Sequence, residues 1–263
     1  MNLTRRMFGA ATLACGIASL AQPAAARAQE VPVIAAASDL RFAVQEIAAA
    51  FAMETGHELR LAFGSTGNFA RQIREGAPFE MFMAADESFV LDLARDGFLR
   101  DEGALYAQGR VAIAVPNQGS PLTADGTLQD LRRALGAGQV SRFAIANPQH
   151  APYGMRAMEV LQHAGMWAAI EPSLVLGENV SQAAQFALSG SADGGIIAWS
   201  LAQSPQLRPL GEFALIPAEW HQPLVQRMAL VRNAGPVAEA FYRYMQMPVA
   251  LEVMARHGFA VPG

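Results

Sequence analysis

Short apolar runs of strand length alternate with amphipathic stretches of helix length along most of the chain. The first run lies at 31–37, and Ser38 separates it from an amphipathic stretch at 39–54. The same order continues with expected strands at 57–63 and 79–84 and expected helices at 68–75 and 87–95. Strands that alternate with helices in this way predict an α/β fold with mostly parallel sheets.

A longer apolar run at 109–116 begins a second series of such units. Further strands are expected at 142–146, 175–176 and 195–198, and helices at 128–135, 155–164 and 181–188. An expected strand at 223–231 then returns to the first series, followed by a helical segment at 235–257 interrupted at Pro248. This order predicts two lobes, a ligand cleft between them and a hinge near Arg110 and Trp220. The lobes comprise residues 29–110 with 221–263, and residues 111–220.

The N-terminus has the parts of an export signal. Arg5 and Arg6 belong to a Thr-Arg-Arg-x-Phe start, and an apolar run from Gly9 to Ala21 follows. We interpret residues 1–28 as a signal peptide that directs the protein to the periplasm by the twin-arginine route. An ordinary Sec signal is the alternative.

The chain contains no lysine, because all 19 residues of the lysine and arginine class are arginines. A P-loop lysine, a lysine Schiff base and a lysine general base are therefore excluded. The single cysteine, Cys15, lies within the expected signal peptide, so the mature chain has no thiol and no disulfide. The five histidines show no metal-binding spacing of the HxxxH or HExxH kind. These observations favour a binding protein without a cofactor over an enzyme.

The mature chain is acidic. Without the three arginines of residues 1–28 it has 16 arginines against 23 acidic residues, a formal charge of −7. We therefore expect no nucleic-acid partner. No mature segment is apolar over the ~20 residues that a membrane helix needs, so we expect a soluble protein, and a monomer.

Four turns between an expected strand and an expected helix stand out, at 37–39, 64–67, 152–154 and 179–181. The start of a helix leaves backbone N–H groups unpaired and carries partial positive charge, so several helix starts facing one point can bind an anion without a cation. Taken singly, Ser38, Asp39 and Thr66 are also ordinary helix caps. The glycines at both ends of the 64–67 turn favour a ligand site, because they permit close backbone approach.

The spelling of these segments resembles that of the periplasmic molybdate-binding proteins of ABC importers. The resemblance is carried by AAASDL (35–40), FGSTGNFARQI (63–73), EGAPF (75–79), AAD (84–86), ANPQHAPYG (146–154) and GENV (177–180). It extends in order and spacing over essentially the whole mature chain. It implies a type II periplasmic binding protein fold that closes around molybdate, and also tungstate, and delivers it to the membrane permease of an ABC importer.

The resemblance also implies which residues bind the oxyanion. Ser38 and Thr66 would donate hydroxyl and backbone hydrogen bonds from the first lobe, with the amide of Asp39 as an addition, and Val180 would donate its amide from the second. Ser38, Thr66 and Val180 would contact the oxygens of the metal oxyanion, and none is a direct metal ligand. Some members supply a tyrosine from a strand position that is Ala198 here. We assign that role to Tyr153.

The orientation of the Asp39 side chain influences which oxyanion the site accepts. Molybdate at neutral pH carries no proton and can only accept hydrogen bonds. Phosphate keeps a proton, which it can donate to a carboxylate acceptor. We expect Asp39 to face solvent in the first turn of its helix, where the helix dipole favours an acid. An inward side chain would make phosphate plausible. Phosphate, sulfate and thiosulfate are therefore the alternative ligands.

Two other classes of binding protein fit less well. An amino-acid binder should offer an arginine for the ligand carboxylate, and the four turns contain none. An iron binder would use a tyrosine pair, but Tyr242 and Tyr244 stand two apart in an expected helix and would point in different directions.

Overall fold

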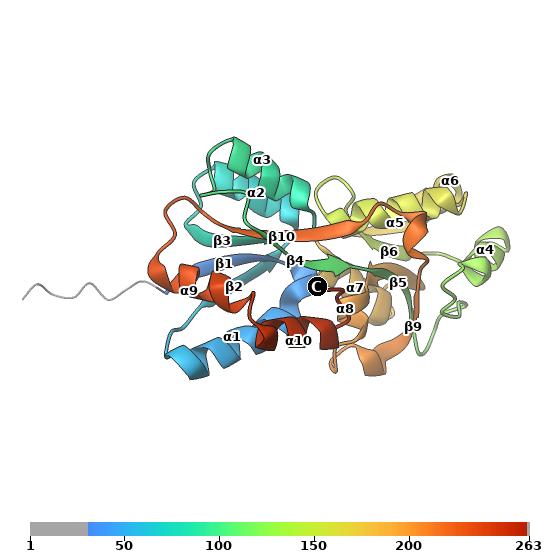
Figure 1. Ribbon diagram of the computed structural model, residues 1–263. Helices are drawn as coiled ribbons and strands as arrows, with labels where there is room; N and C mark the ends of the chain where they lie inside the picture. Colours follow the sequence, from blue (N-terminus) through green and yellow to red (C-terminus); the bar gives the residue numbers. More distant parts are fainter. Residues whose placement is uncertain (1–30, 262–263) are drawn as a thin grey trace, which may run out of the picture. The chain divides into compact units, whose positions relative to one another are not determined.

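The structure is a computed structural model that describes residues 31–261. The predicted signal peptide, with its twin-arginine motif and Cys15, lies outside the described residues. Within the described chain the strands form two separate sheets of five strands each (Figure 1). No helix in this part of the chain is long and apolar enough to cross a membrane.

The first sheet has the strand order β2-β1-β3-β10-β4. Its strands are β1 (Val33–Ala37), β2 (Arg60–Gly64), β3 (Phe79–Ala84), β4 (Ala104–Gly109) and β10 (Leu224–Leu230). β1 pairs in parallel with β2 and β3, whereas β10 pairs antiparallel with both β3 and β4. Four strands therefore run in one direction, and the strand that returns from the far end of the sequence runs in the other.

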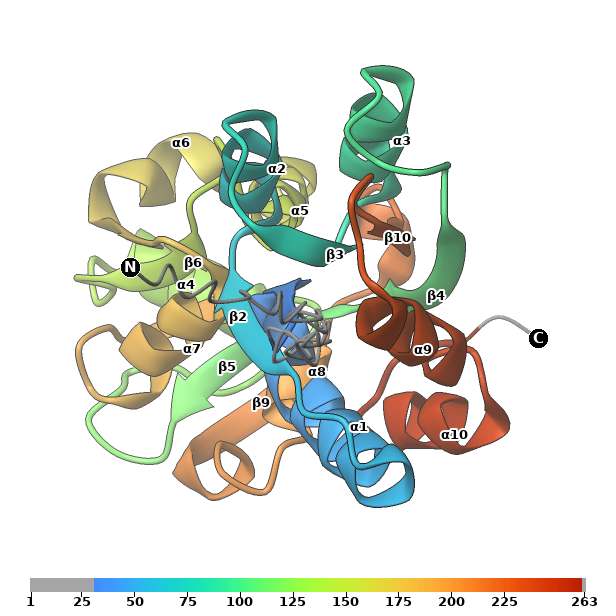
Figure 2. The same ribbon diagram turned by 90° about the vertical axis from the view of Figure 1, so that its left-hand side faces the viewer.

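Helices cover both faces of the first sheet (Figures 1 and 2). One face carries α2 (Thr66–Arg74) and α3 (Glu87–Arg95), and the other carries α1 (Arg41–Thr55), α9 (Pro236–Tyr244) and α10 (Pro248–Arg256). The rings of Phe51 and Phe241 meet edge to face at 5.3 Å between centroids, which fixes α1 against α9.

The second sheet has the order β7-β6-β8-β5-β9 and again one reversed strand. Its strands are β5 (Val111–Pro116), β6 (Phe143–Ala146), β7 (Leu174–Gly177), β8 (Gly194–Ala198) and β9 (Gly211–Leu215). The accompanying helices are α4 (Gln129–Gly136), α5 (Pro152–His163), α6 (Trp167–Ile170), α7 (Val180–Leu188) and α8 (Trp199–Ala202). α5 and α6 lie on one face of this sheet and α7 on the other (Figure 1).

The chain passes between the sheets at two places. Only Arg110 separates the end of β4 from the start of β5, and the second passage leads from β9 through the short 3-10 helix η4 (Ala218–Trp220) to β10. The predicted fold, two mostly parallel sheets flanked by helices, is confirmed.

Two strands, β4 and β9, were not predicted from the sequence. β4 and β9 are edge strands. β4 mixes buried with exposed positions and β9 has only half-buried and exposed ones, so neither contains the continuous apolar run that marks a fully buried strand. The single strand expected at 109–116 is in fact divided at Arg110, because Gly109 ends β4 in one sheet and Val111 begins β5 in the other.

Candidate functional site

A small cavity lies where helix starts from the two sheets meet. Its lining consists of Ala37, Ser38, Asp39, Gly64, Ser65, Thr66, Ala85, Ala151, Pro152, Tyr153, Asn179 and Val180. All four predicted turns and all five predicted binding residues contribute to it. None of these lining residues is an arginine or a histidine. An anion here would be bound by neutral donors and helix dipoles.

Ser38 and Thr66 bring two helix starts to the cavity from the first sheet. Ser38 opens a 3-10 helix, η1 (Ser38–Leu40), that leads into α1, and Thr66 is the first residue of α2. Both side chains are buried, at 2% and 1% exposure. The backbone amides at these positions have no partner within their own helices, since first-turn N–H groups never do.

The two hydroxyl groups are arranged as donors. The Ser38 Oγ accepts a hydrogen bond from the Ser181 amide at 3.2 Å, and the Thr66 Oγ1 accepts one from the Ala85 amide at 3.0 Å. A hydroxyl oxygen that accepts from a neighbour keeps its own hydrogen free to donate. Both hydroxyls can therefore donate that hydrogen to a ligand in the cavity.

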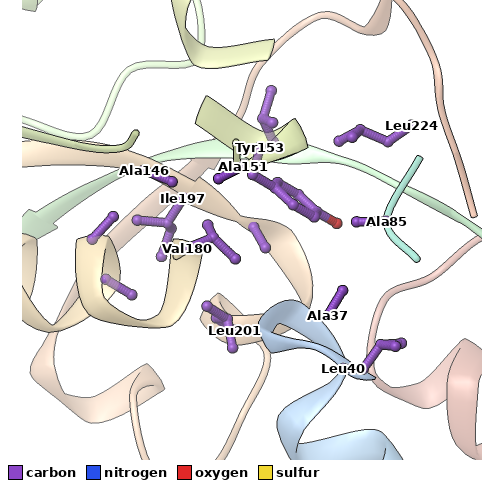
Figure 3. Close-up of a cluster of buried hydrophobic side chains, with 14 of the residues drawn as sticks. Ala37, Leu40, Ala85, Ala146, Ala151, Tyr153, Val180, Ile197, Leu201 and Leu224 are labelled. Atoms are coloured by element: carbon purple, nitrogen blue, oxygen red, sulfur yellow. The ribbon is translucent and has the colours of Figure 1, made fainter. Parts of the chain in front are cut away.

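The second sheet contributes Val180 and Tyr153, each in the first turn of a helix. Val180 begins α7 behind the cap Asn179, whose side chain accepts from the Gln182 amide at 3.1 Å. Tyr153 follows Pro152 at the start of α5. Figure 3 shows the Tyr153 ring among Ala37, Ala85 and Val180, which come from three separate parts of the chain.

The side chain of Asp39 points inward, and the expectation that it faces solvent is wrong. Asp39 is 2% exposed, and its Oδ2 accepts a hydrogen bond of 2.7 Å from the Nε2 of Gln226 on β10. The same Nε2 lies 3.3 Å from the Tyr153 hydroxyl oxygen, to which it also donates. A fully buried amide on β10 thus provides a polar partner inside the protein, which overrides the local preference for a solvated acid.

Burial raises the pKa values of Asp39 and Tyr153. It raises the pKa of Asp39 to about 6, although hydrogen bonds from Gln226 and Tyr153 act in the opposite direction. Burial and the nearby charge of Asp39 hold the pKa of Tyr153 well above its ordinary value. Tyr153 is therefore a neutral donor at every pH of biological interest.

Gln226 was not singled out from the sequence, although a pattern could have revealed it. Along β10 the buried positions alternate with half-buried ones, and Gln226 occupies a buried position between Leu224 and Met228. A polar residue at an inward position of an alternating strand signals a buried hydrogen-bond network.

Gly109 makes room for this network. A Cβ at this position would lie 2.2 Å from the Tyr153 hydroxyl oxygen and 2.9 Å from the Gln226 Nε2. Only glycine allows both polar groups to reach their places.

Hydrogen bonds join the turns of the two sheets directly around the cavity. The Gly67 amide donates to the carbonyl oxygen of His150 at 2.9 Å, and the His150 Nδ1 lies 2.9 Å from the Ser65 Oγ. On the other side the Ser181 hydroxyl donates to the carbonyl oxygen of Ser38 at 2.9 Å. The cavity is therefore bridged on two sides.

An ion pair adds a further link between the elements of the two sheets. Arg156 on α5 lies 2.7 Å from Asp86, the cap of α3, and their side chains are only 7% and 15% exposed.

Within residues 31–261, no group of three or more histidine, cysteine or acidic residues is arranged to hold a metal ion.

Comparison with known proteins identifies the family to which this chain belongs. The family described as bacterial extracellular solute-binding protein matches residues 32–260. The chain is 34% identical to the molybdate-binding protein ModA of Rhodobacter capsulatus, over 95% of both chains. It is 32% identical to the ModA protein of Azotobacter vinelandii, over 97% of this chain and 95% of the relative.

A solved structure agrees with the sequence relatives. The periplasmic molybdate-binding protein of Azotobacter vinelandii superimposes with a TM-score of 0.78 at 28% identity, covering 89% of this chain and 100% of that one. These relatives are binding proteins, which confirms the expectation that the chain is not an enzyme. The chain belongs to the bacterial extracellular solute-binding protein family and, within it, to the family of the ModA proteins.

Proposed function

We propose that this protein captures molybdate, and also tungstate, in the cavity between the two sheets and delivers it to the permease of an ABC importer. The Ser38 and Thr66 hydroxyls, the Val180 and Asp39 amides and the Tyr153 hydroxyl would donate hydrogen bonds to the four oxygens. These residues contact oxygen only, so none is a ligand of the metal atom. The names of the ModA relatives support the choice of molybdate.

The arrangement of the hydroxyl donors carries this proposal. The Ser38 and Thr66 oxygens each accept a hydrogen bond from a neighbouring N–H group, which leaves each hydroxyl hydrogen available to a ligand. The helix starts add unpaired amides. A tetrahedral dianion without protons matches a cavity of this kind, because all of its oxygens are acceptors.

We propose residues 29–110 with 221–263 as one lobe and residues 111–220 as the other, each containing one sheet. Closure would bend the chain at Arg110 and near Trp220. The bonds between the turns then stabilise the closed form that a permease recognises. Residues 1–28 would direct export to the periplasm, and the exported protein would act as a monomer.

The inward carboxyl group of Asp39 favours a second candidate, phosphate. A phosphate that retains a proton could donate it to a carboxylate oxygen, which a molybdate ion cannot do. Sulfate and thiosulfate lack that proton and gain nothing from Asp39.

Isothermal titration of the mature protein with molybdate, tungstate, sulfate and phosphate tests the proposal. Tight binding of molybdate and tungstate without sulfate or phosphate is the expected result. Preferential binding of phosphate or sulfate would assign the protein to another oxyanion, and no heat with any of the four would exclude this site as an oxyanion site.

A further inference from the structure

Asp39 is the one acidic residue that lines the cavity, and its charge has no cationic partner. Its Oδ2 accepts from the neutral amide of Gln226, whereas its Oδ1 has no hydrogen-bond partner within the described chain. Asp39 belongs to none of the ion pairs found among residues 31–261, although the side chain is 2% exposed. A buried carboxylate in this condition is costly to keep ionised.

The elements packed around Asp39 offer no compensating charge. β4 presents Tyr106 and α5 presents Tyr153, which are neutral, and β10 presents the amide of Gln226. Arg41, at the start of α1, has its guanidinium 5.1 Å from the centre of the Phe63 ring, and Arg227 of β10 pairs with Glu87.

The remaining neighbours of Asp39 contribute only neutral groups. α7 reaches η1 through Ser181, and α8 does so through Ser200, whose hydroxyl donates to the Asp39 carbonyl oxygen. A dianion beside an ionised Asp39 would therefore place three negative charges in a buried space where only dipoles oppose them.

We propose that Asp39 is a specificity-determining residue that faces the bound oxyanion as a neutral acid, so that the protein takes up one proton with each dianion it captures. This inference rests on the proposed function of the cavity. The proton comes from the solvent and is bound by the carboxylate of Asp39, and it returns to the solvent when the oxyanion leaves. Burial already raises the pKa of Asp39 to about 6 in the free cavity, and a nearby dianion raises that pKa further.

A neutral Asp39 also changes what Tyr153 can do. An ionised Asp39 accepts a hydrogen bond from Tyr153, which uses the hydroxyl hydrogen within the protein. A protonated Asp39 no longer requires that bond, because its second oxygen still accepts from Gln226. The cavity then gains two donors, the acid proton of Asp39 and the hydroxyl hydrogen of Tyr153. Fully deprotonated oxyanions benefit, and a protonated phosphate finds no free acceptor.

Proton uptake can be measured directly. Molybdate is titrated calorimetrically into the mature protein at about pH 8 in two buffers that differ in ionisation enthalpy, and the difference in observed heat gives the number of protons bound. The expected number is about one for the wild-type protein. The affinity of the wild-type protein should fall by up to about tenfold per pH unit above the pKa of free Asp39.

The variant Asp39→Asn separates the charge from the shape of the side chain. It should bind molybdate more tightly than the wild-type protein at about pH 8, without proton uptake and with little dependence on pH. Glu178→Gln is the matched control, because this acid lies 3.7 Å from His150 with its side chain 70% exposed. It should keep the wild-type proton number.

Two results would overturn the inference. Either the wild-type protein binds molybdate without taking up a proton, or the uptake persists in Asp39→Asn and disappears in His150→Gln, which would assign the proton to the histidine. Both leave the proposed function intact, since molybdate still binds. Absence of molybdate binding in the wild-type protein would instead refute the proposed function itself.

Discussion

The side-chain amide of Gln226 lies 2.7 Å from the Asp39 carboxylate, although the two residues are 187 positions apart in the chain. The bond joins the strand that returns from the far end of the sequence to the first turn after β1. It holds an acidic group at the cavity, whose lining also includes the helix starts of α2 and α7. The cavity therefore consists of local helix starts joined by long-range polar contacts, of which this bond is one.

Thr66→Ala should weaken molybdate binding by roughly 0.5–3 kcal/mol, the range for loss of a donor to a charged group. The substitution removes the hydroxyl hydrogen that we propose is donated to the ligand. Thr66→Ser retains the hydroxyl and should stay close to the wild-type affinity. Calorimetric titration of the three proteins checks this, and equal affinities would exclude the Thr66 hydroxyl as a donor to the ligand.

Tyr153→Phe should weaken binding by a similar amount, roughly 0.5–3 kcal/mol, because the ring remains in place and only the hydroxyl is lost. Tyr242→Phe is a suitable control, since Tyr242 lies on α9 and does not line the cavity. Unchanged affinity in Tyr153→Phe would show that this tyrosine does not replace the one missing at Ala198.

Gly109→Ala should weaken molybdate binding by at least about tenfold, because the new methyl group would lie 2.2 Å from the Tyr153 hydroxyl oxygen and must displace it. Gly136→Ala is the matched control, since a Cβ at Gly136 meets no atom within 4 Å. Titration of both variants distinguishes the displacement of Tyr153 from a general effect of replacing glycine. Normal binding by Gly109→Ala would mean that the position of Tyr153 is unimportant.

Asp39→Asn should stabilise the free protein at neutral pH. The pKa of Asp39 is raised in the folded state to about 6 from an ordinary 3.8, so the folded protein binds a proton that the unfolded chain has already released between these values. Wild-type stability therefore falls as pH rises through this window, by about 3 kcal/mol in all, and the loss persists above it.

The test compares the melting temperatures of the wild-type protein and Asp39→Asn without ligand across that pH range. The variant should gain little at about pH 4 and roughly 6–12 °C near pH 7. A gain that is the same at both pH values would contradict the assignment of the buried charge to Asp39.

Asp86→Asn should lower both stability and molybdate affinity, because it leaves the nearly buried guanidinium of Arg156 without its closest partner across the sheets. An effect of about 1–3 kcal/mol is expected, since Arg156 keeps its second partner, Glu159. The double variant Asp86→Asn with Arg156→Met should recover part of the loss, because the nearly buried guanidinium is removed and the carboxylate left without it, Glu159, is 25% exposed. If the loss in the double variant equals the sum of the losses in Asp86→Asn and Arg156→Met alone, in thermal melts and titrations, the two side chains are not directly coupled.

The fold could be predicted because its determinants are local. Alternation of apolar and amphipathic segments, read along residues 31–257, gave both series of units, and the strand at 79–84 and the helix at 87–95 have the predicted bounds. The missed strands, β4 and β9, lie at sheet edges, where half-exposed positions weaken the pattern. The division at Arg110 depends on which sheet each strand joins, and a continuous apolar run does not contain that information.

The sequence by itself determined the helix starts of the candidate site, because Ser38, Thr66 and Val180 each begin a helix within three residues of the end of a strand. The first turn of a helix presents free amides wherever it lies. Only the tertiary structure decided where the side chain of Asp39 points. Local physical chemistry favours solvent for a first-turn acid, but Gln226 and Tyr153 arrive from distant parts of the chain and enclose the carboxyl group. The charge state of the cavity is therefore a property of long-range packing, which no local pattern in the sequence specifies.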